Sequence, residues 1–314
     1  MLSILIFTKN RQDDLRELIN SVKSQNIDID HEIIIINNGD NNIIFENNFK
    51  FFHYKTNLKR LSEIFNFGWK KCNFQNILFL ADDVILNEDW FINAKKYILN
   101  KNYNFLGGPI LSSSYPAGLM HDLYVKAKKN FFTNLFLKFF IYFSFDKDPF
   151  LPGMICKSGS YTFGASLENS KNLGLIDVDL LTTSTMLVKK EILNQINGFS
   201  ELYNFNHADG DLFLRAKDKG FRVQFDSNLI SFHKVRLGPS RSPYHISRDT
   251  IVFYIQHVRP DSMRAFIGLI LNLMSIFLIY TKQSIQNFNL DAFKCLAGYI
   301  YGVSYMFKFY FLKK

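Results

Sequence analysis

The chain contains few cysteines, and their spacing excludes several classes of protein. Cys72, Cys156 and Cys295 are the only three among 314 residues, and they lie far apart. They lack the close pairing of a structural zinc site and cannot form the disulfide framework of a small secreted domain. Isolated thiols fit a reducing compartment, so we predict a cytoplasmic protein.

The first residues do not resemble a signal peptide. Residues 1–7 lack a basic segment, and their apolar run is too short for the core of a signal sequence. A first β-strand explains this run better. The chain also shows no internal repeat and no low-complexity linker, and its length suits one large domain or two modest ones.

Glycine-rich phosphate-binding motifs are also absent. The sequence has no Gly-x-Gly-x-x-Gly and no Walker motif, which argues against a dinucleotide site or a P-loop NTPase. The formal net charge of +9 favours an anionic partner. Charge alone does not choose among a nucleotide, a membrane surface and nucleic acid.

What the first third does contain is an alternation of apolar runs and helical patterns. Such an alternation predicts a Rossmann-like α/β half with a mostly parallel sheet and right-handed crossovers. The expected strands cover residues 3–7, 32–36, 51–54 and 77–80, and the expected helices begin near residue 13 and cover 61–71.

Two adjacent carboxylates end the last of these strands. Asp82 and Asp83 follow the buried run 77–80 directly. Ligands of open α/β sheets bind at the carboxyl ends of strands, and a divalent metal carrying a phosphorylated ligand suits oxygen donors there. The alternative is a helix-capping Asp in a solvated turn.

The middle of the chain is less regular but contains three further features. Residues 131–145 are strongly aromatic with Lys138 as the only charge, and we interpret this run as core rather than as an exposed apolar surface. Asp209 and Asp211 lie at a predicted helix N-terminus, where Asp209 is a plausible N-cap. A short strand then ends at His233.

Beyond Pro243 the composition shifts to apolar helical stretches at 266–280 and 295–307. Each is shorter than the ~20 residues of a membrane-spanning helix. With flanking lysines, the stretches predict a helical extension, residues 244–314, that lies in the interface of the cytoplasmic membrane face. The alternative is that both helices pack on the preceding domain.

The ordered set of these motifs resembles family 2 glycosyltransferases, the inverting, nucleotide-sugar-dependent enzymes of the GT-A fold. The resemblance covers about Leu2 to Arg248. The residues that carry it are Ser3-Ile-Leu-Ile-Phe-Thr-Lys-Asn-Arg11, Asn37-Asn38-Gly39-Asp40, Asn57, Asn66-Phe67-Gly68, Ala81-Asp82-Asp83, Ala208-Asp209-Gly210-Asp211, His233 and Arg248-Asp249.

The resemblance implies a role for each matched residue. Asp83 and His233 would bind a divalent metal, Mn²⁺ or Mg²⁺, and Asp82 would bind the metal or the donor ribose. Asp209 would be the general base, with Asp211 as its alternate and His207 as an outside candidate. Donor-binding positions would be Thr8, Asn10, Arg11, Asn37, Asn38, Asn57, Asn66, Asp82 and Arg248.

Three departures from the family pattern bear on these roles. Ala81 removes the first carboxylate of the metal motif and leaves coordination to Asp83, His233, diphosphate oxygens and water. Asn37 replaces an acid near the nucleotide base, and Ala208 replaces a Glu beside the catalytic Asp.

The implied protein has a GT-A catalytic domain over residues 1–243, with a nucleotide-sugar half (1–105) and an acceptor half (106–243). It would move a sugar from a nucleoside-diphosphate sugar to a glycan or lipid-linked glycan in bacterial surface polysaccharide or lipopolysaccharide synthesis. Nucleic acid is not an expected partner. Two alternatives stay open: a non-catalytic, membrane-associated homologue, and a sugar-phosphate nucleotidyltransferase, although Thr8–Arg11 lacks the glycine-rich triphosphate loop of the latter.

Overall fold

The first third of the chain folds as an α/β unit with the predicted alternation. The computed structural model describes residues 1–25, 27–40, 43, 51–100, 102–112, 119–234 and 242–311. The first elements are β1 (Leu2–Thr8), α1 (Gln12–Lys23), β2 (His31–Asn37), β3 (Phe52–Lys55), α2 (Leu61–Lys71) and β4 (Asn76–Ala81).

The remaining elements mix short strands with helices and end in three long helices. They are β5 (Val84–Leu86), α3 (Trp90–Asn100), β6 (Phe105–Gly107), β7 (Ile110–Ser112), α4 (Leu119–Lys128), α5 (Phe131–Ser144), α6 (Leu167–Lys171), β8 (Leu175–Asp177), β9 (Thr185–Lys189), α7 (Lys190–Gln195), α8 (Ala208–Asp218), β10 (Val223–Asp226), β11 (Ser231–His233), α9 (Pro243–His257), α10 (Met263–Asn287) and α11 (Asp291–Phe311).

One mixed sheet organises the molecule. Its order is β3-β2-β1-β4-β9-β6-β10-β8. The first four strands in this order, from β3 to β4, are parallel to one another. β9 pairs antiparallel with both β4 and β6. Because Thr8 pairs with Asn37, the polar residues that end β1 and β2 lie side by side at the same edge of the sheet.

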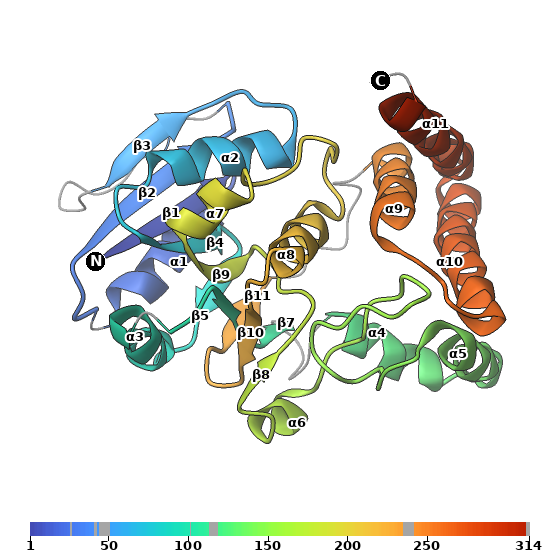
Figure 1. The fold of residues 1–314 in the computed structure, drawn as a ribbon, viewed down its shortest axis with the longest axis horizontal. Coiled ribbons are helices and arrows are strands. Elements are labelled where there is room, and N and C mark those ends of the chain that lie inside the picture. The colour runs from blue at the N-terminus through green and yellow to red at the C-terminus, as the bar shows by residue number, and fades with distance from the viewer. Residues whose placement is uncertain are drawn as a thin grey trace.

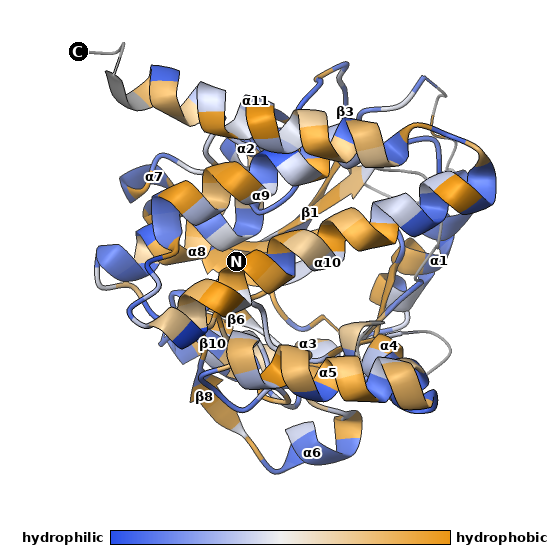
Figure 2. Cartoon of the chain, turned by 90° about the vertical axis from the view of Figure 1, so that its right-hand side faces the viewer, coloured by the Kyte–Doolittle hydropathy of each residue, from blue (hydrophilic) through white to orange (hydrophobic). Residues whose placement is uncertain are grey.

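A layer of helices stands beside this α/β body. Figure 1 shows α9, α10 and α11 on one side of the molecule, with α5 next to the N-terminal part of α10. Figure 2 looks onto this layer and shows α5, α10 and α11 side by side on the same face. The predicted α/β class with a C-terminal helical extension is therefore confirmed.

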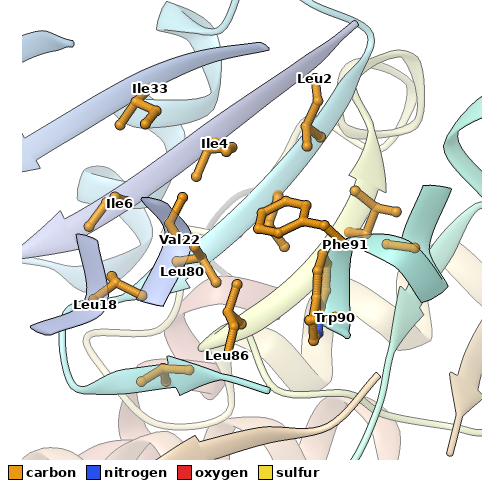
Figure 3. Close-up of a cluster of buried hydrophobic side chains, with 14 of the residues drawn as sticks. Leu2, Ile4, Ile6, Leu18, Val22, Ile33, Leu80, Leu86, Trp90 and Phe91 are labelled. Carbon is orange, nitrogen blue, oxygen red and sulfur yellow. The ribbon is translucent and has the colours of Figure 1, made fainter. Parts of the chain in front are cut away.

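Helices cover both faces of the sheet. Successive residues of each strand point to opposite faces, so each strand contributes apolar side chains to both. On one face Ile4 and Ile33 pack against Leu18 and Val22 of α1 and against Trp90 of α3. Figure 3 shows these side chains meeting between strands and helices. On the other face the next residues along β1 and β2, among them Leu5 and Ile34, pack toward α2 and α8.

Two sequence expectations about the apolar helices are wrong. α5 is not core: Phe132 is 78% exposed and Phe131 is 74% exposed. The helix is apolar around most of its circumference, and such a composition does not indicate which side is covered. α10 spans 25 residues rather than the expected 15, so it is long and apolar enough to cross a membrane.

α11 packs closely on α9 through small residues. A Cβ added to Gly298 would lie 2.4 Å from the carbonyl oxygen of Tyr244, and one added to Gly302 would lie 2.9 Å from that of Arg248. Cys295 and Met306 lie on the same buried side. The inner side of α11 therefore belongs to the folded core, whatever its outer side contacts.

Gly298→Ala should destabilise the protein by about 1–3 kcal/mol, because the added methyl forces the α9 backbone to move. By contrast, a Gly→Ala substitution at an exposed helix position normally raises the free energy of unfolding. Chemical denaturation would measure the change, with the exposed Ser304→Ala on the same helix as control. Equal or higher stability of Gly298→Ala would show that α11 does not pack on α9 as described.

Candidate functional site

The predicted carboxylate turn lies where β1 and β4 end. Asp82 accepts a hydrogen bond from the Thr8 hydroxyl at 2.7 Å. Arg11 Nη1 contacts Asp82 Oδ1 at 3.2 Å and Asp83 Oδ2 at 2.6 Å. Thr8, Arg11, Asp82 and Asp83, all predicted from sequence, therefore form one charged cluster.

His233 joins this cluster through a second, smaller sheet. In the order β5-β11-β7, β11 runs antiparallel to β5, and His233 pairs with Val84. This register places His233 Nε2 3.1 Å from Asp83 Oδ1. An imidazole nitrogen and a carboxylate oxygen that converge in this way are donors that Mn²⁺ accepts.

The metal set provided by protein is small. Among the residues that the structure describes, no group of three His, Cys, Asp or Glu side chains is arranged to hold a metal ion. Asp83 and His233 supply two donors, and Arg11 lies against the same carboxylate. A metal here would need most of its ligands from a bound diphosphate and from water.

The two carboxylates differ in their electrostatics. Burial raises the pKa of Asp82, against the opposing effects of Thr8 and Arg11. Burial also acts to raise the pKa of Asp83, but His233 and Arg11 outweigh it and leave that pKa lowered. Burial acts to lower the pKa of Arg11, while both carboxylates leave it raised. Asp83 is thus the more firmly ionised of the pair.

The predicted donor-side asparagines shape the loops around this edge. Asn38 holds the segment after β3, since it donates to Leu58 O at 2.9 Å and accepts from Leu58 N at 2.8 Å. Asn10 Oδ1 accepts from Asp40 N at 2.9 Å. Asn37 is buried and accepts from Gly39 N at 2.9 Å, whereas Asn57 is exposed.

Two predicted donor-binding residues, Asn66 and Arg248, make contacts within the protein. Asn66 donates to Phe199 O and accepts from Phe199 N, both at 2.8 Å, so it fixes the chain before α8 to α2. Arg248 is 3% exposed, pairs with Asp249 at 2.6 Å and lies over the ring of Tyr305. The structure does not bring either side chain to the Asp82–Asp83 turn.

The two acidic residues of α8 have different environments. Asp211 is 1% exposed and is held by Arg215 at 2.7 Å and by His257 at 3.0 Å. Asp209 is only partly buried, and its Oδ1 accepts from Gly210 N. The expectation that Asp209 is the N-cap is wrong, because His207 occupies that position. Of the two carboxylates, Asp209 is the more exposed.

His207 has a structural role at the start of α8. Its φ of 59° is left-handed, its Nε2 lies 3.1 Å from Thr250 Oγ1, its Nδ1 contacts the Tyr161 hydroxyl, and its ring stacks on Phe253. Burial, followed by the charge of His257, lowers the pKa of His207 to about 3. His207 is therefore neutral and occupied at both ring nitrogens.

Sequence analysis missed the role of Asp249. This fully buried carboxylate accepts hydrogen bonds from the backbone N–H groups of Asn204, Phe205 and Asn206. It thereby shapes the loop that leads into His207 and Asp209. The signal in the sequence is the charged Arg248–Asp249 pair directly before the apolar run Ile251–Ile255.

The sequence and the fold are similar to known proteins. Residues 3–150 match the sequence model of the family described as Glycosyl transferase family 2. GalNAc-T7 with UDP, GalNAc and Mn2+ superimposes with a TM-score of 0.59 at 11% identity, over 81% of this chain and 47% of that chain. The mannosyltransferase PcManGT from Pyrobaculum calidifontis with GDP-Man and Mn2+ superimposes with a TM-score of 0.51 at 9% identity. The match covers 100% of this chain and 88% of that chain.

A third similar structure is S. aureus TarS 1-349 in complex with UDP-GlcNAc, with a TM-score of 0.51 at 14% identity, over 86% of this chain and 71% of that chain. At these identities the likeness concerns the fold alone. The matched region spans under half of GalNAc-T7, and 41% of a longer TarS chain. No curated protein matches the sequence.

His207 should make the protein less stable in acid. Its folded pKa of about 3 lies below the ordinary value near 6.5, so the unfolded chain binds the extra proton between these values. Stability should therefore fall as pH drops below about 6.5, by up to ~1.4 kcal/mol per pH unit from this residue. His207→Asn, which tolerates a left-handed backbone, should flatten the fall.

Denaturant unfolding at pH 7, 6, 5 and 4 measures this slope. The exposed His31→Asn substitution controls for the loss of an imidazole elsewhere. An unchanged slope in His207→Asn would contradict the assignment of a neutral, enclosed imidazole.

Proposed function

We propose that this chain, which has a GT-A fold, is a metal-dependent, inverting glycosyltransferase of family 2 that uses a nucleoside-diphosphate sugar. The observation that carries the proposal is the cluster of Asp82, Asp83, Arg11 and His233 at the carboxyl end of β4. The solved neighbours hold UDP, UDP-GlcNAc or GDP-Man, which supports a nucleotide-sugar donor.

The protein groups at this edge suit a diphosphate leaving group. Asp83 Oδ1 and His233 Nε2 are 3.1 Å apart and would hold a divalent cation together with diphosphate oxygens and water. Such a cation offsets the negative charge that develops on the leaving diphosphate. In the structure the Arg11 guanidinium pairs with the Asp83 carboxylate. When the donor binds, the guanidinium would contact a phosphate oxygen in place of that carboxylate.

Asp209 is the proposed general base. As the acceptor oxygen attacks the anomeric carbon, the bond to the diphosphate breaks and the acceptor proton passes to the Asp209 carboxylate. Direct in-line displacement inverts the anomeric centre. Partial exposure of Asp209 supports this role over Asp211, whose two oxygens are held by Arg215 and His257.

Acceptor and location extend the proposal. We propose a hydroxyl of a glycan or lipid-linked glycan as acceptor, in the assembly of a bacterial surface polysaccharide or lipopolysaccharide, at the cytoplasmic face of the membrane. Residues 1–243 would form the catalytic domain and 244–314 the membrane-associated extension. Through Asp249, however, α9 also supports the loop that carries Asp209.

A specific observation keeps a non-catalytic homologue as the second candidate. Ala81 removes one carboxylate of the metal motif, and Arg11 pairs with both that remain. Retention of Asp83, Asp209 and His233 favours the enzyme. Donor hydrolysis with Mn²⁺ or Mg²⁺, measured over a panel of nucleotide sugars, separates the two candidates.

Metal dependence should centre on Asp83. In the wild type, excess EDTA should abolish donor hydrolysis and transfer, and Asp83→Ala should do the same while Asp82→Ala retains part of the activity. Calorimetry of UDP and GDP binding with and without Mn²⁺ gives a second readout. The control is Asp13→Ala, whose side chain is 91% exposed. Full activity of Asp83→Ala, or of wild type in EDTA, would reject the metal assignment.

Asp209→Asn should reduce transfer by roughly 10²–10⁴-fold, because the amide cannot accept the acceptor proton. Donor binding and the melting temperature should stay near the wild-type values. Asp211→Asn should instead lower stability by roughly 3 kcal/mol, since it leaves Arg215 and His257 without their buried partner. Normal turnover by a folded Asp209→Asn, together with an inactive but stable Asp211→Asn, would exchange the two roles.

A further inference from the structure

Three helices expose apolar side chains on the same side of the molecule. On each helix these residues recur every three or four positions, which places them on one helix face. They are Phe131, Phe132, Leu135, Phe136, Phe139 and Tyr142 on α5, Met263, Phe266, Ile270, Met274 and Leu278 on α10, and Phe293, Leu296, Ile300, Val303 and Phe307 on α11. We call this surface the three-helix apolar face.

The three helices are in contact, so their exposed residues form one surface. α10 packs on both α5 and α11. In Figure 2 they lie side by side on the face turned to the viewer, and much of each ribbon has the hydrophobic colour. The outer side of α5 carries Phe132, Leu135, Phe136, Lys138, Phe139 and Tyr142, all of them exposed. Monomeric soluble proteins rarely expose so large an apolar patch.

The charges on these three helices and on α4, which precedes α5, favour an anionic partner. Residues 119–144 and 263–311 contain eight basic side chains and two acidic ones. Of the acidic pair, Asp122 is buried against Ser112 and Asp291 is paired with Lys294. The basic side chains are Lys126, Lys128, Lys129, Lys138, Arg264, Lys282, Lys294 and Lys308, and all eight are exposed.

We propose that the three-helix apolar face lies flat on an anionic lipid bilayer, with α10 in the plane of the membrane rather than across it. Aromatic and aliphatic side chains enter the acyl boundary, and lysines contact the headgroups. A second copy of the chain would bury the same apolar residues, but it would bring the cations of α5, α10 and α11 toward those of the other copy, with only Asp291 as an acidic residue on these helices.

The contacts of α10 explain why it lies on the membrane and does not cross it. Asn272, in the middle of α10, accepts from Ser160 Oγ at 2.8 Å and donates to Ser158 O at 3.2 Å. Gly268 lies against the backbone of Phe143, and Arg264 donates to carbonyl groups at the end of α5. A spanning α10 would have to break these bonds and place Asn272 in hydrocarbon.

The attachment also sets the position of the catalytic helix. The segment that Asn272 holds continues to Tyr161, whose hydroxyl contacts His207 at the start of α8. The Tyr161 hydroxyl also lies 3.2 Å from the position of a Cβ added to Gly210, the residue that follows Asp209. A lipid-linked acceptor would thus meet Asp209 at a fixed distance from the membrane surface. This consequence rests on the proposed function, whereas binding of the three-helix apolar face to lipid does not.

Flotation of the full-length protein with sealed vesicles tests the binding. Vesicles of phosphatidylglycerol and phosphatidylcholine should recover the wild type at low salt, and phosphatidylcholine alone should recover much less. The double variant Phe132→Glu/Phe139→Glu should bind at least about tenfold more weakly. Ile92→Glu/Leu99→Glu on α3 is the matched control, since these exposed residues lie away from the apolar face and should leave binding unchanged.

Three results would overturn the proposal. The first is equal recovery of wild type and Phe132→Glu/Phe139→Glu, and the second is no recovery on anionic vesicles. The third is a dimer that only Phe132→Glu/Phe139→Glu dissociates, seen by light scattering without vesicle binding. Because flotation uses no sugar donor, a negative result here leaves the glycosyltransferase activity untouched, and loss of activity leaves membrane binding untouched.

Cysteine labelling separates a helix that lies on the membrane from one that crosses it. The natural cysteines are buried, so Asp261→Cys and Gln286→Cys place single reactive thiols near the two ends of α10. With protein added outside sealed vesicles, an impermeant maleimide should label both positions. Protection of Gln286→Cys until detergent is added would mean that α10 spans the bilayer and would reject the proposal.

Discussion

Two carboxylates at the end of a buried strand need cationic or hydrogen-bonding partners, and much of the site follows from that need. Asp82 and Asp83 are 4% and 9% exposed. Thr8 and Arg11 come from the end of β1, which pairs with β4, and His233 comes from the small sheet that begins just after the turn. The two sheets are therefore joined electrostatically at the position where a diphosphate would bind. Leaving either carboxylate ionised and unpaired there would be strongly unfavourable.

A second buried charge supports the other half of the site. Asp249 accepts hydrogen bonds from three backbone N–H groups of the loop before α8, and it pairs with Arg248, which lies over the ring of Tyr305. From the opposite side Asn66 of α2 holds Phe199. Residues of α2 and α9 thus hold the same segment, residues 199–206. This segment leads into α8, which carries Asp209. The C-terminal helices are for this reason part of the site as well as of the apolar face.

The inner and outer sides of α10 and α11 differ in exposure and in the contacts they make. The inner side of α11 uses Gly298 and Gly302 to approach α9 closely, and the inner side of α10 uses Gly268 and Asn272 to contact α5 and the segment before Tyr161. Polar and small residues fix position, while the outer sides keep long apolar side chains exposed. Attachment to a bilayer through such outer sides would need no rearrangement of the catalytic part.

The sequence by itself determined the α/β half, because periods of two and 3.6 residues are local properties of the chain. It also determined that Asp82 and Asp83 follow a buried strand and that Asp209 begins a helix. Tertiary structure alone decided that His233 lies beside Asp83, since strands 150 residues apart must pair in one register. Only packing distinguished Asp209, which is partly exposed, from Asp211, which Arg215 and His257 enclose. Packing also explains why the expectation that α5 is core was wrong. The hydrophobicity of a side chain favours its removal from water, but only the surrounding fold decides whether other protein residues cover it.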